Sequence, residues 1–265
     1  MSAELCALSI AGLTVAVGVN SAAVLDALRS RYQDFPACGR PQLTAYVHWT
    51  PQARCQAEPA PAVVFDVNRL RFVTAGFAGA IELDNATAEL SLTSTRPVDD
   101  IEYFLRVVYA WLMFHHGGIL LHAAAVVRGG RAYLFLGPSG SGKTTVARLS
   151  KDASVLNDDL VVLCRQAEGW QVYATPFWNP DQVRPSPGKA PLAAFYRLVQ
   201  DKRVFAEPMR TAQALAELLA NVPLVASAPA CNPALIERSL SLLQMTPAYR
   251  LHFLPDDSFW KVIEA

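Results

Sequence analysis

The chain has 265 residues, of which 52% are hydrophobic and 17% are charged. This composition can fill a sizeable core, argues against disorder and suits one or two domains. The 23 basic and 23 acidic residues give a formal net charge of zero at pH 7. A neutral chain lacks the sequence-independent attraction that nucleic-acid binders and membrane-surface proteins use, so we expect neither nucleic acid nor a membrane as a partner.

Cysteine usage and the apolar segments predict a cytoplasmic protein. The five cysteines are scattered and include no C-x-x-C pair, so we expect neither a disulfide framework nor a zinc ribbon. The N-terminus carries an acidic residue, Glu4, and no basic segment, which argues against a signal peptide. The most apolar stretch, Ile101–Val127, is interrupted by arginine, histidine and glycine and is too broken to cross a bilayer. These features favour free thiols in a reducing cytoplasm.

Residues 1–95 are predicted to form a small α+β domain. Leu5–Val19 suits one or two strands with Gly12 at a turn, and Ser21 is the expected N-cap of a helix that ends near Tyr32. Apolar segments separated by proline, glycine, asparagine and aspartate indicate further short strands. These strands are expected at Leu43–Trp49, Ala62–Val67, Leu70–Thr74, Ala80–Leu83 and Ala88–Leu92.

Residues 96–265 are predicted to form a second domain of mixed α/β type. Pro97 followed by acidic residues is typical of a helix N-terminus, and this helix is expected to end near His115, before a Gly-Gly pair. Antiparallel strands are then expected around a core that contains a phosphate-binding loop. The expected strands are Ile119–Val127, Ala132–Leu136, Val155–Leu156, Leu160–Leu163, Trp170–Ala174, Ala193–Val199 and Tyr249–Leu254, and the expected helices are Thr144–Ser150, Ala212–Ala220, Pro233–Leu243 and a capped helix after Asp256.

Residues 137–144 read Gly-Pro-Ser-Gly-Ser-Gly-Lys-Thr and match the pattern G-x-x-x-x-G-K-[ST] in full. In such a loop, glycines let backbone N–H groups surround phosphate oxygens, and the following helix directs its positive end at them. Lys143 is expected to reach the β- and γ-phosphates of ATP, and the Thr144 hydroxyl is expected to bind magnesium as Mg²⁺. The predicted nucleotide-binding residues are Gly137, Pro138, Ser139, Gly140, Ser141, Gly142, Lys143, Thr144 and Thr145.

A pair of acidic residues follows the loop in the chain. Asn157-Asp158-Asp159 comes directly after the short apolar segment Val155-Leu156. In P-loop proteins a carboxylate at a strand end supports Mg²⁺ near the phosphates. Two adjacent carboxylates permit a division of labour, with one near the metal and one accepting the proton of an attacking hydroxyl. An exposed Asn-Asp turn fits the residue types equally well, but the position shortly after Lys143 favours a functional role.

The predicted hairpin places His122 near the glycine-rich loop. Gly129 and Gly130 lie between two apolar runs, which is a signal for a two-residue turn. Residues equally distant from this turn pair with one another, so His122 is expected opposite Gly137, the first glycine of the loop. An imidazole there would orient an attacking group or the γ-phosphate. A partly buried histidine satisfied by the backbone is an equally good interpretation.

The chain resembles a known family at these segments. Leu121-His122, Gly137–Thr144 and Asn157-Asp158-Asp159 look like the catalytic domain of HPr serine kinase/phosphorylase. They are more similar still to the HPr-kinase-related proteins often encoded beside peptide-modification gene clusters, whose pattern also includes Thr175-Pro176-Phe177-Trp178. The resemblance covers roughly residues 97–265 and implies a P-loop kinase core of the HPr kinase / phosphoenolpyruvate carboxykinase type.

The resemblance implies an ATP-dependent serine kinase that phosphorylates a peptide or small protein, with a ribosomally made precursor peptide as one such acceptor. It implies Asp158 as the base, His122 and Lys143 beside the transferred phosphoryl group, and Thr144 and Asp159 on the metal side. The family's E-[IV]-R-G-x-G-[IL] segment after the acid pair is absent, and residues 173–180 stand in its place. Its absence argues against phosphorolysis and against a second carboxylate contact to metal.

Two alternatives for the function stay open. One is a nucleotide-binding regulatory subunit with little catalysis, and the other is a small-molecule kinase on the same fold. The family often forms rings, so a homo-oligomer is compatible with the resemblance. Phe177-Trp178 would either stack on adenine or plug a loop onto the core. A local excess of basic residues would either receive an acidic peptide or form a solvated surface. These residues are Arg184, Lys189, Arg197, Lys202, Arg203 and Arg210.

Overall fold

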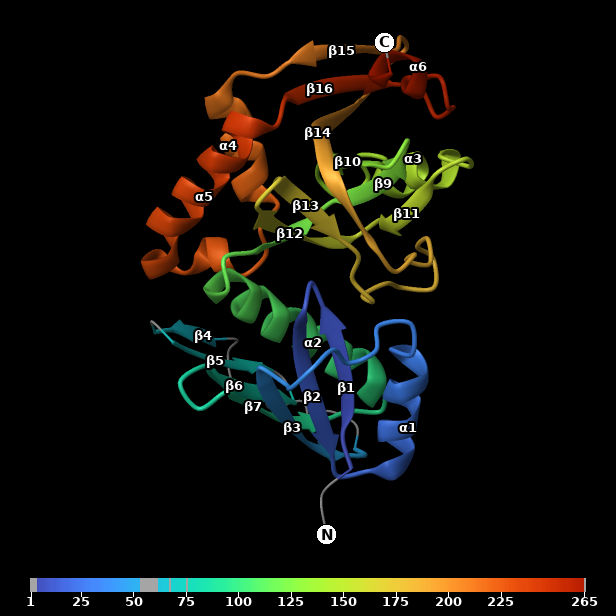
Figure 1. The fold of residues 1–265 in the computed structure, drawn as a ribbon. Helices are drawn as coiled ribbons and strands as arrows, with labels where there is room; N and C mark the ends of the chain where they lie inside the picture. The colour runs from blue at the N-terminus through green and yellow to red at the C-terminus, as the bar shows by residue number, and fades with distance from the viewer. Residues whose placement is uncertain (1–3, 53–61, 67, 75, 265) are drawn as a thin grey trace. The chain divides into compact units, whose positions relative to one another are not determined.

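The computed structural model describes residues 4–52, 62–66, 68–74 and 76–264. It confirms the α/β class, with one mixed sheet in each of two compact units, Met1–Leu112 and Met113–Ala265 (Figure 1). The units divide within helix α2 (Pro97–His115), further along the chain than the boundary at residue 95 that the sequence suggests. No helix among the described residues is long and apolar enough to span a membrane.

The first unit is built on a sheet of seven strands in the order β1-β2-β3-β7-β6-β5-β4. Strands β2 and β3 pair in parallel, as do β3 and β7, and the remaining pairs are antiparallel. The turn between β1 and β2 contains Gly12 with a φ of 83°, as the sequence predicts. The strands are β1 (Cys6–Ile10), β2 (Leu13–Val19), β3 (Leu43–Thr50), β4 (Ala62–Phe65), β5 (Arg69–Thr74), β6 (Phe77–Glu82) and β7 (Thr87–Thr93).

Two helices pack in this unit. Helix α1 (Ala22–Arg31) begins after Ser21, whose hydroxyl accepts a hydrogen bond from the Val24 amide and so caps the helix as predicted. α1 packs on β1 and β2. The α2 side chain Tyr109 donates from its hydroxyl to the carbonyl oxygen of Leu8 at 2.8 Å, which ties this helix to β1.

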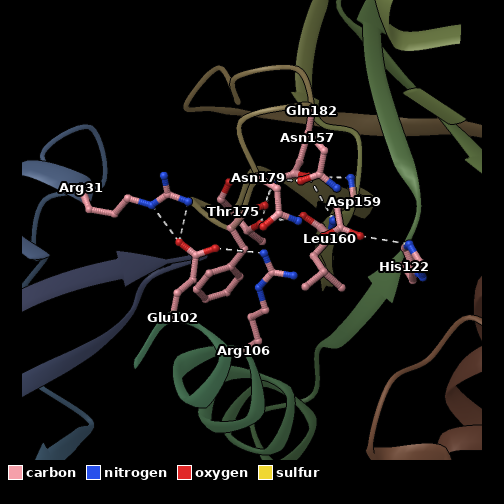
Figure 2. Close-up of polar contacts among 11 residues, drawn as sticks. Arg31, Glu102, Arg106, His122, Asn157, Asp159, Leu160, Thr175, Asn179 and Gln182 are labelled. Carbon is pink, nitrogen blue, oxygen red and sulfur yellow. Dashed lines mark hydrogen bonds and ion pairs between the residues drawn. The ribbon is translucent and has the colours of Figure 1, made fainter. Parts of the chain in front are cut away.

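A buried ion cluster joins the end of α1 to α2 within the first unit. Glu102, on α2, is only 5% exposed. One of its carboxylate oxygens lies 2.7 Å from Nη2 of Arg31, and the other lies 2.9 Å from Nη2 of Arg106 (Figure 2). Each carboxylate oxygen therefore has its own guanidinium partner, which compensates the buried charge.

The second unit is built on a sheet of nine strands. Its main path runs β11-β9-β10-β14-β13-β12-β8, and β16 pairs with both β14 and β15. Strand β14 pairs in parallel with β10 and β16, and the other pairs are antiparallel. The strands are β8 (Ile119–His122), β9 (Ala124–Arg128), β10 (Arg131–Leu136), β11 (Ser154–Asn157), β12 (Leu160–Gln166), β13 (Gly169–Tyr173), β14 (Lys189–Gln200), β15 (Phe205–Pro208) and β16 (Ala248–Phe253).

The predicted strand Ile119–Val127 is wrong as a single element. The chain breaks at Ala123, so that β8 pairs with β12 whereas β9 pairs with β10 and β11. The amide of Ala123 donates to the carbonyl oxygen of Asp159 at 2.9 Å, which satisfies the backbone at the break. The run is apolar throughout because both halves are buried, and periodicity alone does not show where one partner replaces another.

The helices of the second unit lie near the predicted ranges. Helix α3 (Lys143–Leu149) packs on β9 and β10, and α4 (Thr211–Ala220) lies beside α5 (Asn232–Met245) (Figure 1). The short helix α6 (Phe259–Ile263) has no side-chain cap, contrary to expectation, but its Phe259 and Trp260 are buried in the core as the sequence predicts. The four described cysteines, Cys6, Cys38, Cys164 and Cys231, are free thiols.

Candidate functional site

The glycine-rich loop follows strand β10 and leads into helix α3. Gly137, Gly140 and Gly142 have φ angles of 150°, 77° and 108°, a region that favours glycine. A Cβ atom on Gly142 would lie 2.5 Å from Cζ of Phe253, the last residue of β16. The loop therefore requires glycine at this position for both its backbone angle and its close approach to β16.

Lys143 starts α3 with its side chain folded back over the loop. Its ammonium donates to the carbonyl oxygens of Gly137 at 2.7 Å and Pro138 at 3.3 Å. The residue is 8% exposed, and burial lowers the pKa of its ammonium. The sequence pattern thus places one desolvated cation inside the concave side of the loop.

Asn157 organises the turn that carries the acid pair, a role the sequence analysis missed. Its amide nitrogen donates to the carbonyl oxygens of Thr175 at 3.0 Å and Phe177 at 2.8 Å. Its amide oxygen accepts from the backbone N–H groups of Asp159 at 2.6 Å and Leu160 at 3.0 Å (Figure 2). Asn157 is fully buried, so the segment is not the exposed Asn-Asp turn of the alternative interpretation.

Asp158 is buried and incompletely paired. The residue is 2% exposed, and its Oδ2 accepts from the Val183 amide at 3.3 Å. Its buried Oδ1 has no partner at hydrogen-bond distance among the described residues. Burial raises the pKa of the carboxyl, and hydrogen bonding from the Thr144 hydroxyl and the Val183 amide offsets part of that rise.

Asp159 lies beside His122. The Nε2 atom of the imidazole is 3.0 Å from Oδ1 of the carboxylate, as Figure 2 shows. The predicted position of His122 opposite Gly137 is wrong, because the hairpin ladder that centres on Gly129-Gly130 ends at Ala124. His122 belongs to β8 instead, where it pairs with Leu160 of β12. The strand break therefore directs His122 toward the acid pair.

A pocket of about 270 Å³ joins these groups. It brings together the cation, both carboxylates, the imidazole and most of the loop, whereas Gly137, Pro138 and Ser141 do not line it. Gln182 and Gln200 line it as well, although no pattern in the sequence marked them. Nε2 of Gln200 donates to the Gly140 carbonyl oxygen at 2.9 Å. The lining residues are His122, Ser139, Gly140, Gly142, Lys143, Thr144, Thr145, Asp158, Asp159, Gln182 and Gln200.

Two further expectations from the sequence concern Phe177-Trp178 and the basic residues of 184–210. Phe177 is fully buried, so this residue plugs its loop onto the core, whereas Trp178 is half-buried and its stacking on adenine stays a prediction. Three of the six basic residues of 184–210 have local partners, and the expectation of an acidic-peptide surface stays a prediction. Lys189 lies over the ring of Tyr173 and Arg203 lies over that of Phe205. Arg197 pairs with Glu217 of α4 at 3.0 Å.

The pocket holds only part of a metal coordination shell. Among the described residues there is no group of three or more His, Cys, Asp and Glu side chains that could hold a metal ion. The pocket does combine the Thr144 hydroxyl with a buried carboxylate oxygen of Asp158 that lacks a partner. Mg²⁺ is usually held by one or two carboxylates together with water and substrate phosphates, so this donor set fits Mg²⁺ that arrives with a nucleotide.

The geometry defines a mixed α/β protein whose pocket lies between a glycine-rich loop and an acid pair. Residues 94–265 match the family model of the SynChlorMet cassette protein ScmC. This match spans more than half of the chain, and the chain belongs to the ScmC family. No curated protein matches the sequence.

Proposed function

We propose that this chain is an ATP-dependent phosphotransferase with a P-loop kinase core of the HPr kinase / phosphoenolpyruvate carboxykinase type. The observation that carries the proposal is the pocket itself, where a buried lysine, a glycine-rich loop and two carboxylates meet. Each group has a role in phosphoryl transfer, which depends on positioning and on neutralising charge. The resemblance to HPr-kinase-related proteins points to the same chemistry.

The loop from Gly137 to Thr145 would hold the phosphates of ATP through its backbone N–H groups. Lys143 would exchange its two carbonyl contacts for the β- and γ-phosphate oxygens, which are better partners for a desolvated ammonium. Thr144 and one carboxylate of the acid pair would hold Mg²⁺. The ion supplies neutralisation of the phosphate charge when it is bound.

In the proposed reaction, a hydroxyl oxygen of the acceptor forms a bond to the γ-phosphorus. The bond from that phosphorus to the β,γ-bridging oxygen breaks, and ADP leaves. The hydroxyl proton passes to a carboxylate of the acid pair. The acceptor that we propose is a serine or threonine of a peptide or small protein, because the resemblance is strongest to proteins encoded beside peptide-modification genes.

The proposal is tested with γ-labelled ATP, Mg²⁺ and peptides encoded by neighbouring genes. We expect label on a peptide and expect Lys143→Ala to abolish both nucleotide binding and transfer. Lys151→Ala is the matched control, because Lys151 is exposed and lies outside the pocket. Failure of the unmodified chain to bind Mg·ATP in calorimetry would contradict the proposal.

A second candidate function is a nucleotide-binding regulatory subunit. Residues 173–180, which stand in place of the family's glutamate-containing run, do not line the pocket, and Gln182 after them contributes an amide instead of a carboxylate. Tight Mg·ATP binding without any turnover would favour this candidate. Label in a small metabolite, with none on a peptide, would instead favour a small-molecule kinase.

A further inference from the structure

A second polar pocket lies in the second unit and shares no lining residue with the pocket at the phosphate loop. We propose that this second pocket, here named the α5 pocket, binds a carboxylate group. The proposal is independent of the phosphotransferase activity. The α5 pocket has a volume of about 310 Å³ and is lined by Gly117, Arg165, Trp170, Ala234, Glu237, Arg238 and Ser241.

Two elements of the fold supply the polar side chains of the α5 pocket. Arg165 of β12 and Trp170 of β13 are direct partners in an antiparallel strand pair, so their side chains project from the same face of the hairpin. Ala234, Arg238 and Ser241 are spaced by four and three residues along α5 and share one face of that helix. One hairpin face and one helix face therefore meet at this pocket.

Trp170 contributes a hydrogen-bond donor that the fold leaves unused. The residue is 4% exposed, and its buried Nε1 atom has no hydrogen-bond partner among the described residues. An indole nitrogen can only donate, and a buried donor without an acceptor is unfavourable. A ligand that places an acceptor oxygen in the pocket removes this cost.

Two guanidinium groups give the α5 pocket its positive charge. Nη1 of Arg238 donates to the carbonyl oxygens of Phe114 at 2.8 Å and Gly118 at 2.9 Å, and the group lies over the Phe114 ring. Nη1 of Arg165 donates to Oγ of Ser241 at 3.0 Å. These partners are neutral, so neither guanidinium has a carboxylate partner among the residues that the structure describes. Both retain N–H groups for an anion.

The charge of the lining residues selects a carboxylate. Glu237 also lines the pocket, so two guanidinium groups and one carboxylate leave an excess of one positive charge. This excess matches a monoanion and is too small for a phosphate dianion. A carboxylate is planar, matches the fork of a guanidinium group and can accept several hydrogen bonds at once. Ser241 accepts from Arg165 and so keeps its own hydroxyl proton for the same ligand.

The size of the α5 pocket limits what carries the carboxylate. Its volume of about 310 Å³ is at the lower end of the range of small-molecule pockets, roughly 300–1,000 Å³. It suits one acidic side chain of a peptide or one small organic acid. These two sources present the same chemical group, and the experiment separates them.

The proposal is tested through the indole N–H signal of Trp170 in nitrogen–proton correlation spectra of the full chain. The chain has five tryptophans, and Trp170→Phe identifies the signal. The probes are glutarate and a capped peptide with one glutamate among alanines, and the matched control is the same peptide with glutamine. We expect a saturable downfield shift with a carboxylate probe, and expect none with the glutamine peptide or with sodium chloride at equal ionic strength.

The two carboxylate probes identify the source of the ligand. A shift with the glutamate peptide and none with glutarate would support the pocket as a site for an acidic peptide. The reverse would support it as a site for a free organic acid. A signal that stays in place with both probes, or that moves equally with the glutamine peptide, would overturn the proposal. None of these results bears on nucleotide binding, so the proposed function is tested separately.

Substitutions at the exposed part of the pocket give the sign of each contribution. We expect Arg165→Gln to weaken binding of the effective probe about tenfold, because a charge-assisted donor is lost. Glu237→Gln should strengthen it about twofold, because a like charge is removed. Arg131→Gln is the control, since Arg131 is exposed and lies outside the pocket. Unchanged affinity in Arg165→Gln, with the other indole signals in place, would overturn the proposal.

Discussion

Glu102 in the first unit and Asp158 in the second are buried to similar degrees, at 5% and 2% exposure, and are paired in opposite ways. Glu102 has a guanidinium against each carboxylate oxygen, from Arg31 and Arg106. Asp158 accepts a hydrogen bond from the Val183 amide through one oxygen, and its other oxygen lacks a hydrogen-bond partner among the described residues. Burial alone therefore does not distinguish a structural carboxylate from a functional one.

The difference shows where the compensating charge comes from. Moving a carboxylate out of water costs several kcal/mol, and the fold must supply cations or hydrogen bonds to offset that cost. Around Glu102 the chain supplies two cations itself, which favours a structural role. Around Asp158 no cation of the described residues is at hydrogen-bond distance, although Lys143 lines the same pocket, so full compensation requires a proton or a cation from solution. The substitutions Glu102→Gln, Asp158→Asn and Asp26→Asn test this contrast.

The largest effect is expected for Glu102→Gln. Removing the central anion leaves two partly buried guanidinium groups without their partner, and the first unit should lose about 3 kcal/mol of unfolding free energy. Urea denaturation followed by circular dichroism measures this loss. Glu82→Gln is the control, because the pair of Glu82 with Arg69 is more exposed and should contribute little. Equal losses of unfolding free energy for Glu102→Gln and Glu82→Gln would contradict the structural role of the buried Glu102.

The opposite sign is expected for Asp158→Asn. The substitution removes a desolvated charge that lacks full compensation, so without nucleotide or divalent cation the second unit should gain about 1 kcal/mol. Thermal denaturation of the metal-free chain measures the gain, with the exposed Asp152→Asn as the matched control. A clear loss of stability in Asp158→Asn would mean that the carboxylate is structural after all.

A smaller effect is expected in the pH dependence of the same pair of proteins. Burial raises the pKa of Asp158 above its ordinary value of 3.8, so the folded chain holds this proton to higher pH than the unfolded chain does. The unmodified protein therefore loses stability as pH rises through that interval. The advantage of Asp158→Asn should therefore grow as the pH rises above the ordinary carboxyl pKa of 3.8. Denaturant titrations at several pH values check this, and a constant difference would contradict it.

The smallest effect is expected at an exposed ion pair. Asp26 lies 2.9 Å from Arg29 within α1, with their side chains 69% and 42% exposed. Water and salt screen such a pair, so Asp26→Asn should leave the unfolding midpoint unchanged within error, at low salt as at high salt. A salt-dependent drop in the midpoint would show that pairing matters more than burial in this protein.

Much of the fold was predictable because it depends on local signals. The helix Pro97–His115 agrees with its predicted ends, since proline, acidic residues and a Gly-Gly pair mark both termini. Strand β15 (Phe205–Pro208) was missed because it has only four residues, includes a glutamate and a proline, and is held by pairing with β16. Strand partners also escaped prediction, since the contacts that select them come from distant parts of the chain.

The site was predictable where a motif carries its own geometry. Most of the loop residues and both members of the acid pair line one pocket. Asn157, Gln182 and Gln200 were not identified, because their roles depend on loops that meet only after folding. The position of His122 was wrong for a related reason, since the register of a hairpin says nothing about where one of its strands changes partner.

The tip of the hairpin between β9 and β10 has a practical consequence. Gly129 and Gly130 are exposed, with φ angles of 57° and 73°, and a Cβ atom at either would meet nothing within 4 Å. The tip lies at the start of β10, a strand length of about 20 Å from the phosphate loop. It is therefore a suitable place to insert a tag or a surface tether, provided that the inserted segment restores a tight turn. A chain anchored there would leave its pocket open to solution.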